Sequence, residues 1–262
     1  MDEHEDPPPS DSQSNPPKDS QSDYIPPLLV GDDVEQIYGG TETDGYPDCC
    51  ALGNEFMGYY CTGTLVAPNV VLTAKHCSAE FNVSRVFLKG SDVSEPEGAE
   101  IINVKEAHPH PDPNVDLLVL VLEKPSTVDR RAIAKNVLVK PENAIVVGFG
   151  RTNPSGTKGY GRKRKATVPV MTLDCSDADS EAKYGCRPGF ELVAGHRGLK
   201  RDTCKGDSGG PLYIEDDDGN PVLLGVTSRG VRGAGKPCGN GGIYVRADRF
   251  VEWIHDVTGV KI

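Results

Sequence analysis

The chain has 262 residues, eight cysteines and a formal net charge of −11. Its length allows one double-barrel domain or two small domains with an ample core. Ten acidic residues and one base, Lys18, lie in residues 1–36, so residues 37–262 carry a net charge of only −2. The net charge of the whole chain therefore does not imply a generally acidic surface for this larger part of it.

The eight cysteines predict disulfides and an oxidising compartment, although reduced thiols in a cytosolic protein would give the same count. No Cys-x-x-Cys pair occurs, so we expect no zinc site. Met1–Ser22 contains no apolar run, and the sequence as given has neither a signal peptide nor a transmembrane segment. We expect a secreted or cell-envelope protein whose signal peptide has been removed, with a cytosolic protein as the alternative.

The first segment of the chain is rich in proline. Residues 1–27 contain seven prolines, together with serines and acidic residues. Such a composition cannot bury enough apolar surface to offset the entropy lost on ordering. We therefore predict a disordered acidic tail over residues 1–36, which is either a passive linker or a tether to a membrane anchor or cell wall.

Short β-rich segments follow. Residues 61–74 form two such runs separated by the turn signal Pro68-Asn69, and they predict a hairpin that ends just before His76. Further strands, at the spacing of an antiparallel barrel, are predicted at residues 85–88, 101–104 and 116–122.

An acidic loop lies between two of these strands and contains Asp92, Glu95, Glu97 and Glu100. Because the loop lacks an EF-hand pattern, we interpret it as solvated, with a calcium site as the alternative.

After a polar connector, the second half of the chain begins with the apolar run of residues 143–150. Four consecutive bases, Arg162–Lys165, invite a nucleic-acid or heparin interpretation. We favour the solvated start of a strand, because Tyr160 is the one aromatic residue beside them that could stack on bases. At the end of the chain, Asp248 is expected to cap a helix whose apolar residues have helical spacing: Phe250, Val251, Ile254 and Val257.

Three segments carry chemistry. Asp202–Pro211 places the hydroxyl of Ser208 among small residues that let backbone amides face a substrate, although a plain turn would use the same residue types. Upstream, His76 follows Thr73-Ala74-Lys75, and Asp116 lies in Asn114-Val115-Asp116-Leu117. A His, an Asp and a Ser in this chain order are typical of one class of serine hydrolase. From Ile37 to the C-terminus, the sequence resembles the trypsin-like (chymotrypsin-fold) serine protease family.

The resemblance implies an all-β fold, in which two antiparallel six-stranded β-barrels pack together and a C-terminal α-helix follows. Residues 1–36 would be a tail and propeptide, and residues 37–262 the protease domain. Within that domain we expect a first barrel at about 41–123, a connector at about 124–142, a second barrel at about 143–246 and a helix at about 248–258.

The resemblance also implies catalytic roles. Ser208 would be the nucleophile, His76 its general base, and Asp116 the group that orients the imidazole. The backbone amides of Gly206 and Ser208 would form the oxyanion hole. Ser228 resembles the residue that gives the Asp additional support.

Specificity is implied in the same way. Asp202 lies six residues before the proposed nucleophile, where trypsin-like members place the base of the substrate pocket, and Gly230 and Gly242 match the small pocket walls. The predicted cleavage is therefore after Arg or Lys. Arg229 stands where Trp is common and Lys205 near the pocket rim, so acidic residues beside the cleaved position should be tolerated.

Activation is the third implication. Val34-Glu35-Gln36-Ile37 resembles the family's activation junction, with Tyr38 in place of the usual Val. Cleavage between Gln36 and Ile37 would free an ammonium that pairs with Asp207. Because Lys18 is the only base upstream, we expect a separate activating protease. A hairpin turn at the glycines after Tyr38 is the structural alternative.

The cysteines partly follow the family. Two bridges have counterparts there, Cys61 to Cys77 and Cys204 to Cys238, and Cys175 could bridge to Cys186. Val193 stands where a cysteine is usual, so this last bridge departs from the family. The redox state of Cys49 and Cys50 stays open.

We predict a monomeric serine endopeptidase that acts on protein or peptide substrates with Arg or Lys at the cleaved position. We expect no cofactor, no metal and no nucleic-acid partner. Two alternatives are a catalytically inactive, protease-like binding module and a hydrolase of small esters that uses the same site.

Overall fold

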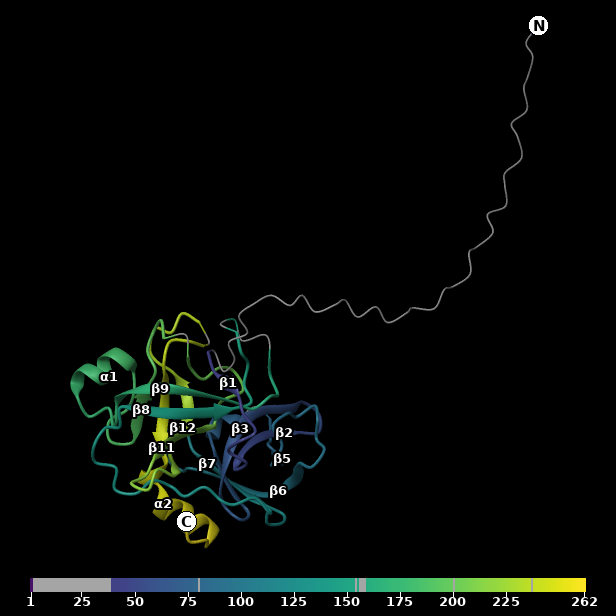
Figure 1. Cartoon of the computed structure of the whole chain (residues 1–262), viewed down its shortest axis with the longest axis horizontal. Coiled ribbons are helices and arrows are strands. Elements are labelled where there is room, and N and C mark those ends of the chain that lie inside the picture. Colours follow the sequence, from purple (N-terminus) through teal and green to yellow (C-terminus); the bar gives the residue numbers. More distant parts are fainter. Residues whose placement is uncertain (2–38, 80, 154, 156–158, 200, 237) are drawn as a thin grey trace. The chain divides into compact units, whose positions relative to one another are not determined.

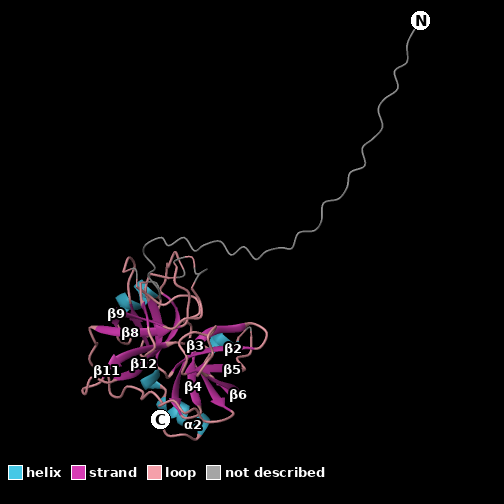
Figure 2. Ribbon diagram, turned by 45° about the vertical axis from the view of Figure 1, so that its right-hand side comes forward, coloured by secondary structure: helices cyan, strands magenta, loops and turns pink. Residues whose placement is uncertain are grey.

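The computed structural model describes Met1 and residues 39–79, 81–153, 155, 159–199, 201–236 and 238–262. The predicted disordered tail and the Gln36-Ile37 junction lie outside these residues. The described part is mainly β, and Figures 1 and 2 show its strands in two groups.

The first group is a closed barrel with the strand order β2-β3-β4-β7-β6-β5. Its strands are β2 (Cys49–Asn54), β3 (Gly58–Ala67), β4 (Val70–Thr73), β5 (Arg85–Leu88), β6 (Glu100–Pro109) and β7 (Leu118–Leu122). The predicted hairpin is present as β3 and β4. The strand predicted at 101–104 is longer in the structure, because β6 pairs with β5 along its first part and with β7 along the rest.

The second group closes through the pairing of β8 with β9. It consists of β8 (Asn143–Gly148), β9 (Arg164–Thr172), β10 (Glu191–Ala194), β11 (Pro211–Glu215), β12 (Pro221–Gly230) and β13 (Gly242–Arg246). The short β1 (Thr41–Glu42) pairs with the start of β9. The predicted fold of two six-stranded antiparallel barrels is confirmed.

One hydrophobic core joins the barrels. Phe87 of the first barrel packs edge-on against Phe149 of the second, with ring centroids 6.1 Å apart, and both are fully buried. Ile254, from the C-terminal helix, belongs to the same cluster. Each such buried side chain stabilises the fold by about 1.5–3 kcal/mol, so the barrels are held together along the seam where the predicted site lies.

Helices are few in the described residues: α1 (Ala178–Tyr184), α2 (Val251–Thr258) and the 3₁₀ turns η1 (Lys75–Ser78) and η2 (Ala247–Arg249). None of them is long and apolar enough to cross a membrane. The C-terminal helix is confirmed, but the expected cap is wrong. Phe250 stands at the N-cap without a side-chain hydrogen bond, because the Asp248 carboxylate accepts instead from Arg246, at 2.6 and 3.0 Å.

The basic run before β9 is built into the fold. Lys163 is fully buried and donates to the Tyr46 carbonyl at 3.0 Å. Arg162 pairs with Glu42 at 2.8 Å, and Arg164, which is 4% exposed, pairs with the same carboxylate at 3.2 Å. The run is therefore the start of a strand, but the prediction that it is solvated is wrong for Lys163 and Arg164, whose side chains are buried against backbone carbonyls and Glu42. It does not present four free bases to a polyanion.

The acidic loop also has internal partners. Asp92 accepts from Arg162 at 3.0 Å, and Glu100 accepts from Ser126 at 2.6 Å and from Thr127. Within the described part of the chain, no group of three or more His, Cys, Asp or Glu side chains is arranged to hold a metal ion.

Candidate active site

His76 and Asp116 meet because their strands are neighbours. β4 pairs with β7, with Thr73 opposite Leu118, and these strand ends deliver the two residues to the same edge of the barrel. His76 Nδ1 lies 2.8 Å from Asp116 Oδ2, and the His76 amide donates to Oδ1 at 3.0 Å. The carboxylate thus fixes both the ring and the backbone of the histidine.

Asp116 has a third partner from the other barrel. The Ser228 hydroxyl on β12 donates to Oδ2 at 2.7 Å. Burial raises the pKa of Asp116, but the hydrogen bonds from His76 and Ser228 outweigh it, so the pKa lies below its ordinary value. An ionised carboxylate in this place can orient the imidazole and stabilise its protonated form.

Ser208 lies in the loop between Cys204 and β11, against the first barrel. Its carbonyl accepts from the Thr62 amide at 2.9 Å, and the next amide, that of Gly209, donates to the Thr227 carbonyl at 2.8 Å. Gly209 has a φ of 77°, and a Cβ there would lie 1.9 Å from Thr73 Oγ1. Backbone bonds and tight packing therefore set the position of the serine.

No hydrogen bond joins Ser208 Oγ to the His76 ring among the described atoms. The two side chains come from opposite barrels, with His76 42% exposed and Ser208 partly buried. Hydrogen bonds of this kind are often long or absent before substrate binds.

Two backbone amides beside Ser208 are available to a ligand. Gly206 has a φ of 99°, and within the described residues neither its N–H nor that of Ser208 has an acceptor, whereas the Asp207 N–H bonds to the Cys204 carbonyl at 3.0 Å. A Cβ on Gly206 would lie 2.7 Å from the Tyr160 ring. The left-handed glycine thus leaves a pair of donors that could receive an oxyanion.

Asp207 is fully buried. Its carboxylate accepts from the amides of Gly150 and Cys204, both at 2.8 Å. Burial nevertheless raises its pKa to about 7. A Cβ on Gly148 would lie 2.1 Å from this carboxylate, and one on Gly150 2.4 Å. Among the described residues no cationic side chain lies within ion-pairing distance of Asp207, and Ile37 lies outside them.

A pocket of about 310 Å³ opens beside Ser208. Asp202, Ser228, Gly230 and Gly242 line it together. Asp202 is 3% exposed and accepts from three amides, those of Thr203 and Gly241 at 2.8 Å and Asn240 at 3.1 Å. Burial outweighs these bonds and raises the pKa of Asp202 to about 6.

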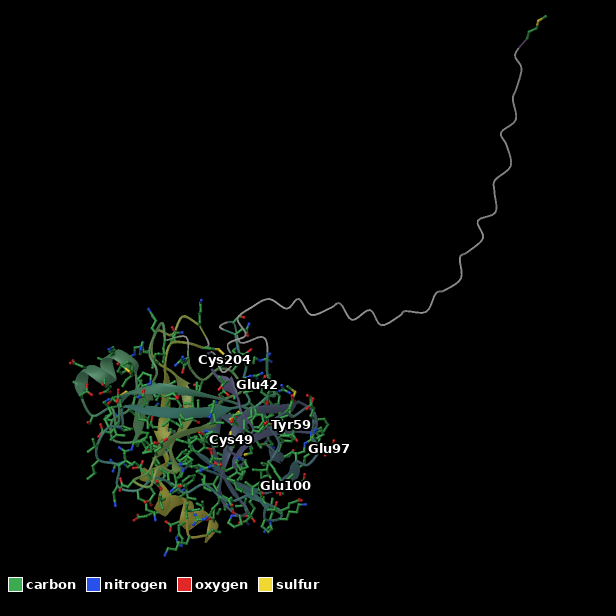
Figure 3. The ribbon with its side chains drawn as sticks, viewed as in Figure 1. Glu42, Cys49, Tyr59, Glu97, Glu100 and Cys204 are labelled. Carbon is green, nitrogen blue, oxygen red and sulfur yellow. A yellow bond between two sulfur atoms is a disulfide. The ribbon has the colours of Figure 1, made fainter. Side chains whose placement is uncertain are left out.

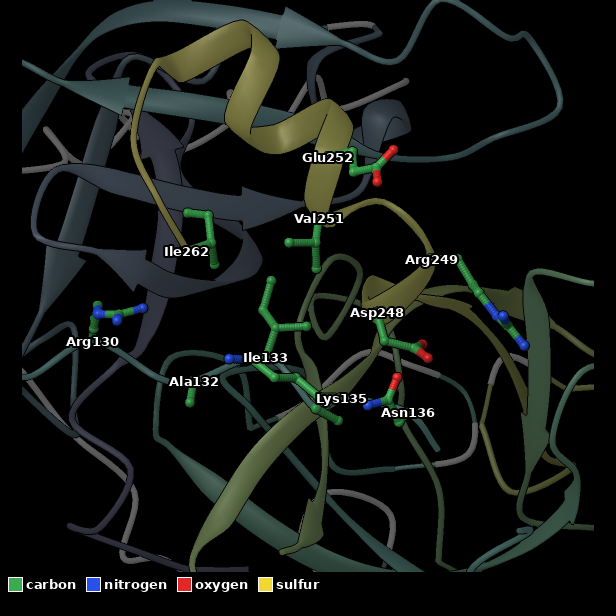
Figure 4. Close-up of a pocket in the computed structure, with 11 residues that line it drawn as sticks. Arg130, Ala132, Ile133, Lys135, Asn136, Asp248, Arg249, Val251, Glu252 and Ile262 are labelled. Carbon is green, nitrogen blue, oxygen red and sulfur yellow. The ribbon is translucent and has the colours of Figure 1, made fainter. Parts of the chain in front are cut away.

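A larger cavity of about 560 Å³ lies between the connector and α2, where Ile133, Val251 and Ile262 line it (Figure 4). None of the predicted catalytic or specificity residues reaches it.

Glu191 is a buried residue that the sequence did not single out. It is fully buried on β10, and its carboxylate accepts from Arg229 at 2.7 and 2.8 Å. The amide of Arg187 donates to it at 2.6 Å, and the Arg187 guanidinium at 3.3 Å. This group of three, which we call the Glu191 clamp, pairs the charge of Arg229 with a buried carboxylate, although the Arg229 side chain is 35% exposed and lines the pocket.

The Glu191 clamp reaches both sides of Asp116. Arg229 lies 3.4 Å from the Ser228 hydroxyl, which itself donates to Asp116. Arg187 donates at 3.1 Å to the carbonyl of Asn114, two residues before Asp116. Arg229 in place of Trp was the one signal in the sequence. Its partner lies 38 residues away and becomes visible only when the strand order is known.

Three disulfides are present: Cys61–Cys77, Cys175–Cys186 and Cys204–Cys238. The first ties β3 to the turn that carries His76, and the third lies beside the pocket. Cys204 and Cys49 are labelled in Figure 3. Cys49 and Cys50 are free thiols and are fully buried, and burial raises the pKa of both.

In the comparison with family models, the model described as Trypsin matches residues 37–254.

Proposed function

Because the chain belongs to the trypsin family, we propose that residues 37–262 are an active serine endopeptidase that cleaves after Arg or Lys. A serine peptidase domain follows from the family, and the specificity and the active state are our proposal. One observation carries it. The His76–Asp116 pair, at 2.8 Å, lies beside a pocket that Ser208 and the buried Asp202 line together.

In the proposed reaction, His76 takes the proton of Ser208 as the hydroxyl attacks the substrate carbonyl. The new C–O bond gives a tetrahedral oxyanion, which the amides of Gly206 and Ser208 receive. Removal of one such donor typically costs about 3 kcal/mol of transition-state stabilisation. His76 then gives the proton to the leaving amine as the C–N bond breaks, and water releases the acyl group from Ser208 by the same steps.

The Asp202 carboxylate supports the choice of Arg or Lys. A buried carboxylate that amides satisfy only in part favours a cation that enters the pocket, and it disfavours an acidic side chain. Arg can pair with the carboxylate more directly than Lys, because its planar guanidinium presents two N–H groups to the two carboxylate oxygens.

We further propose that the protein is made as a zymogen. The raised pKa of Asp207 shows that its two amide bonds do not compensate for burial, and a new Ile37 ammonium would supply the missing charge. Because the precursor has no Arg or Lys at position 36, a different protease would cut between Gln36 and Ile37. The family and the three disulfides support an extracellular protease, and we propose that it is secreted or attached to the cell envelope as a monomer.

The test combines sequencing with kinetics. The active form should begin at Ile37 and should hydrolyse Arg and Lys amides, but not Phe amides, with activity lost in Ser208→Ala and basic selectivity lost in Asp202→Ser. A stable domain that binds such peptides without cleaving them would identify the inactive binding module instead. Hydrolysis of simple esters without any gain from longer peptides would identify the small-ester hydrolase.

A further inference from the structure

Charge is distributed unevenly around the pocket. The lining residues lie within two longer segments, residues 183–210 and 226–242, which contain nine basic and three acidic residues, a net charge of +6, whereas residues 37–262 together carry −2. The three acidic residues are Glu191, Asp202 and Asp207, and all of them are buried. Every exposed charged side chain of these two segments is therefore positive.

These two segments carry five exposed cations, which together we call the basic rim: Arg197, Arg201, Lys205, Arg232 and Lys236. Lys205 and Lys236 line the pocket directly. Arg197 donates to the Gly233 carbonyl at 2.7 Å, and Arg232 to the Ala182 carbonyl at 3.2 Å. Among the described residues, no member of the rim has a carboxylate partner. Arg229 differs from the members of the rim, because its guanidinium forms an ion pair with the Glu191 carboxylate.

The rim has a consequence for substrates that carry Arg or Lys. A cationic side chain must pass exposed positive charges before it reaches the Asp202 carboxylate, and this repulsion slows its encounter with the pocket. Acidic residues on either side of the cleaved position reverse the sign of that interaction, because they would contact the rim while the cation enters the pocket.

Resting on the proposed function, we propose that the enzyme selects Arg or Lys bonds within acidic peptide segments. The fit favours a peptide over a nucleic acid or a sulfated polysaccharide. The pocket has a carboxylate at its base and a serine on its wall, and no aromatic side chain lines it to stack on a base. A polyanion without a cationic group has no group that would bind to the Asp202 carboxylate at the base of this pocket.

The experiment uses the activated enzyme and three matched peptides with Arg at the cleaved position. Acidic residues flank the Arg in the first, their amides Asn and Gln in the second, and Lys in the third. We expect kcat/KM to rise by about two- to fivefold for each acidic residue over its amide at low salt, and the gain to shrink as salt screens the rim. The double variant Lys205→Gln/Lys236→Gln should lose most of the gain.

Lys124→Gln is the matched control, because it removes an exposed lysine from the turn after β7, outside the pocket lining. It should keep the full acidic preference. Equal rates on the acidic and amide peptides, or a preference that persists in the double variant, would overturn the inference while leaving the proposed protease intact. Absence of cleavage of all three peptides, including the amide one, would instead refute the proposed function. Tight binding of heparin or single-stranded DNA, without any acidic preference in peptides, would assign the rim to a polyanion and overturn the inference.

Discussion

The Glu191 clamp makes a quantitative prediction. Glu191→Gln keeps the size of the side chain but replaces one carboxylate oxygen by an amide donor, which would face the N–H groups of Arg187 or Arg229. Removing one partner of a buried ion pair costs about 3–5 kcal/mol. Both guanidinium groups are partly solvated, at 43% and 35% exposure, so we expect a smaller loss of unfolding free energy, about 2–4 kcal/mol.

The assay is urea unfolding of the disulfide-bonded protein, with the shift of the midpoint at constant slope as the readout. Glu181→Gln is the control, because Glu181 is exposed on α1, and its free energy of unfolding should change by no more than about 0.5 kcal/mol. Equal stability of Glu191→Gln and the parent protein would refute our account of the clamp. A further expectation is a lower kcat with little change in KM, because the clamp contacts Ser228 and the Asn114 carbonyl on either side of Asp116.

The remaining predictions concern other carboxylates and their surroundings. Asp116→Asn should lower kcat by about 10⁴-fold with the fold intact, as it does in the Ser-His-Asp template. As pH falls through about 6, Asp202 takes up a proton, so the ratio of kcat/KM for Arg over Phe peptides should fall. The folded-state pKa of Asp207 is raised to about 7, so stability of the uncleaved form should be greatest below the unfolded pKa near 4 and decline as pH rises to about 7. Asp207→Asn should flatten this decline in thermal unfolding. Gly150→Ala, whose Cβ would lie 2.4 Å from the Asp207 carboxylate, should destabilise the domain and abolish activation, and normal cleavage with full amidase activity would contradict that reasoning.

The fold could be predicted from the sequence, and so could the residues that the structure brings together around Ser208, because each motif that carries them is local. The run around Ser208 needs Gly209 in a left-handed conformation against Thr73, and Asp207 needs the space that Gly148 and Gly150 leave. Asp207 and Gly209 stand directly beside Ser208 in the sequence, although the residues they pack against come from distant segments, with Gly150 57 positions from Asp207. The same local rule failed for Asp248, since a cap pattern cannot show that Arg246 competes for the carboxylate.

The Glu191 clamp could not be predicted, because it depends on the pairing of distant strands. Glu191 lies on β10 and Arg229 on β12, and β13 lies between them. Nothing within either segment identifies the other, and an isolated Arg in place of Trp looks like a surface cation. The interpretation of Arg229 as a free charge beside the substrate follows from that gap. In the structure Arg229 is paired with Glu191, and Lys205 and Lys236 line the pocket without a carboxylate partner among the described residues.

The three buried carboxylates near the pocket differ in how their charge is balanced, and the difference separates structure from function. Glu191 has two guanidinium groups of its own chain. Asp202 and Asp207 have only backbone amides among the described residues, and burial raises the pKa of these two to about 6 and about 7. A carboxylate that the fold buries without a cation is costly unless a cation arrives from elsewhere. In our proposal the substrate side chain supplies it to Asp202 and the new Ile37 terminus to Asp207. Both carboxyl groups should therefore release their protons at lower pH once these partners are bound, which a pH titration of inhibitor binding and of activation can measure separately.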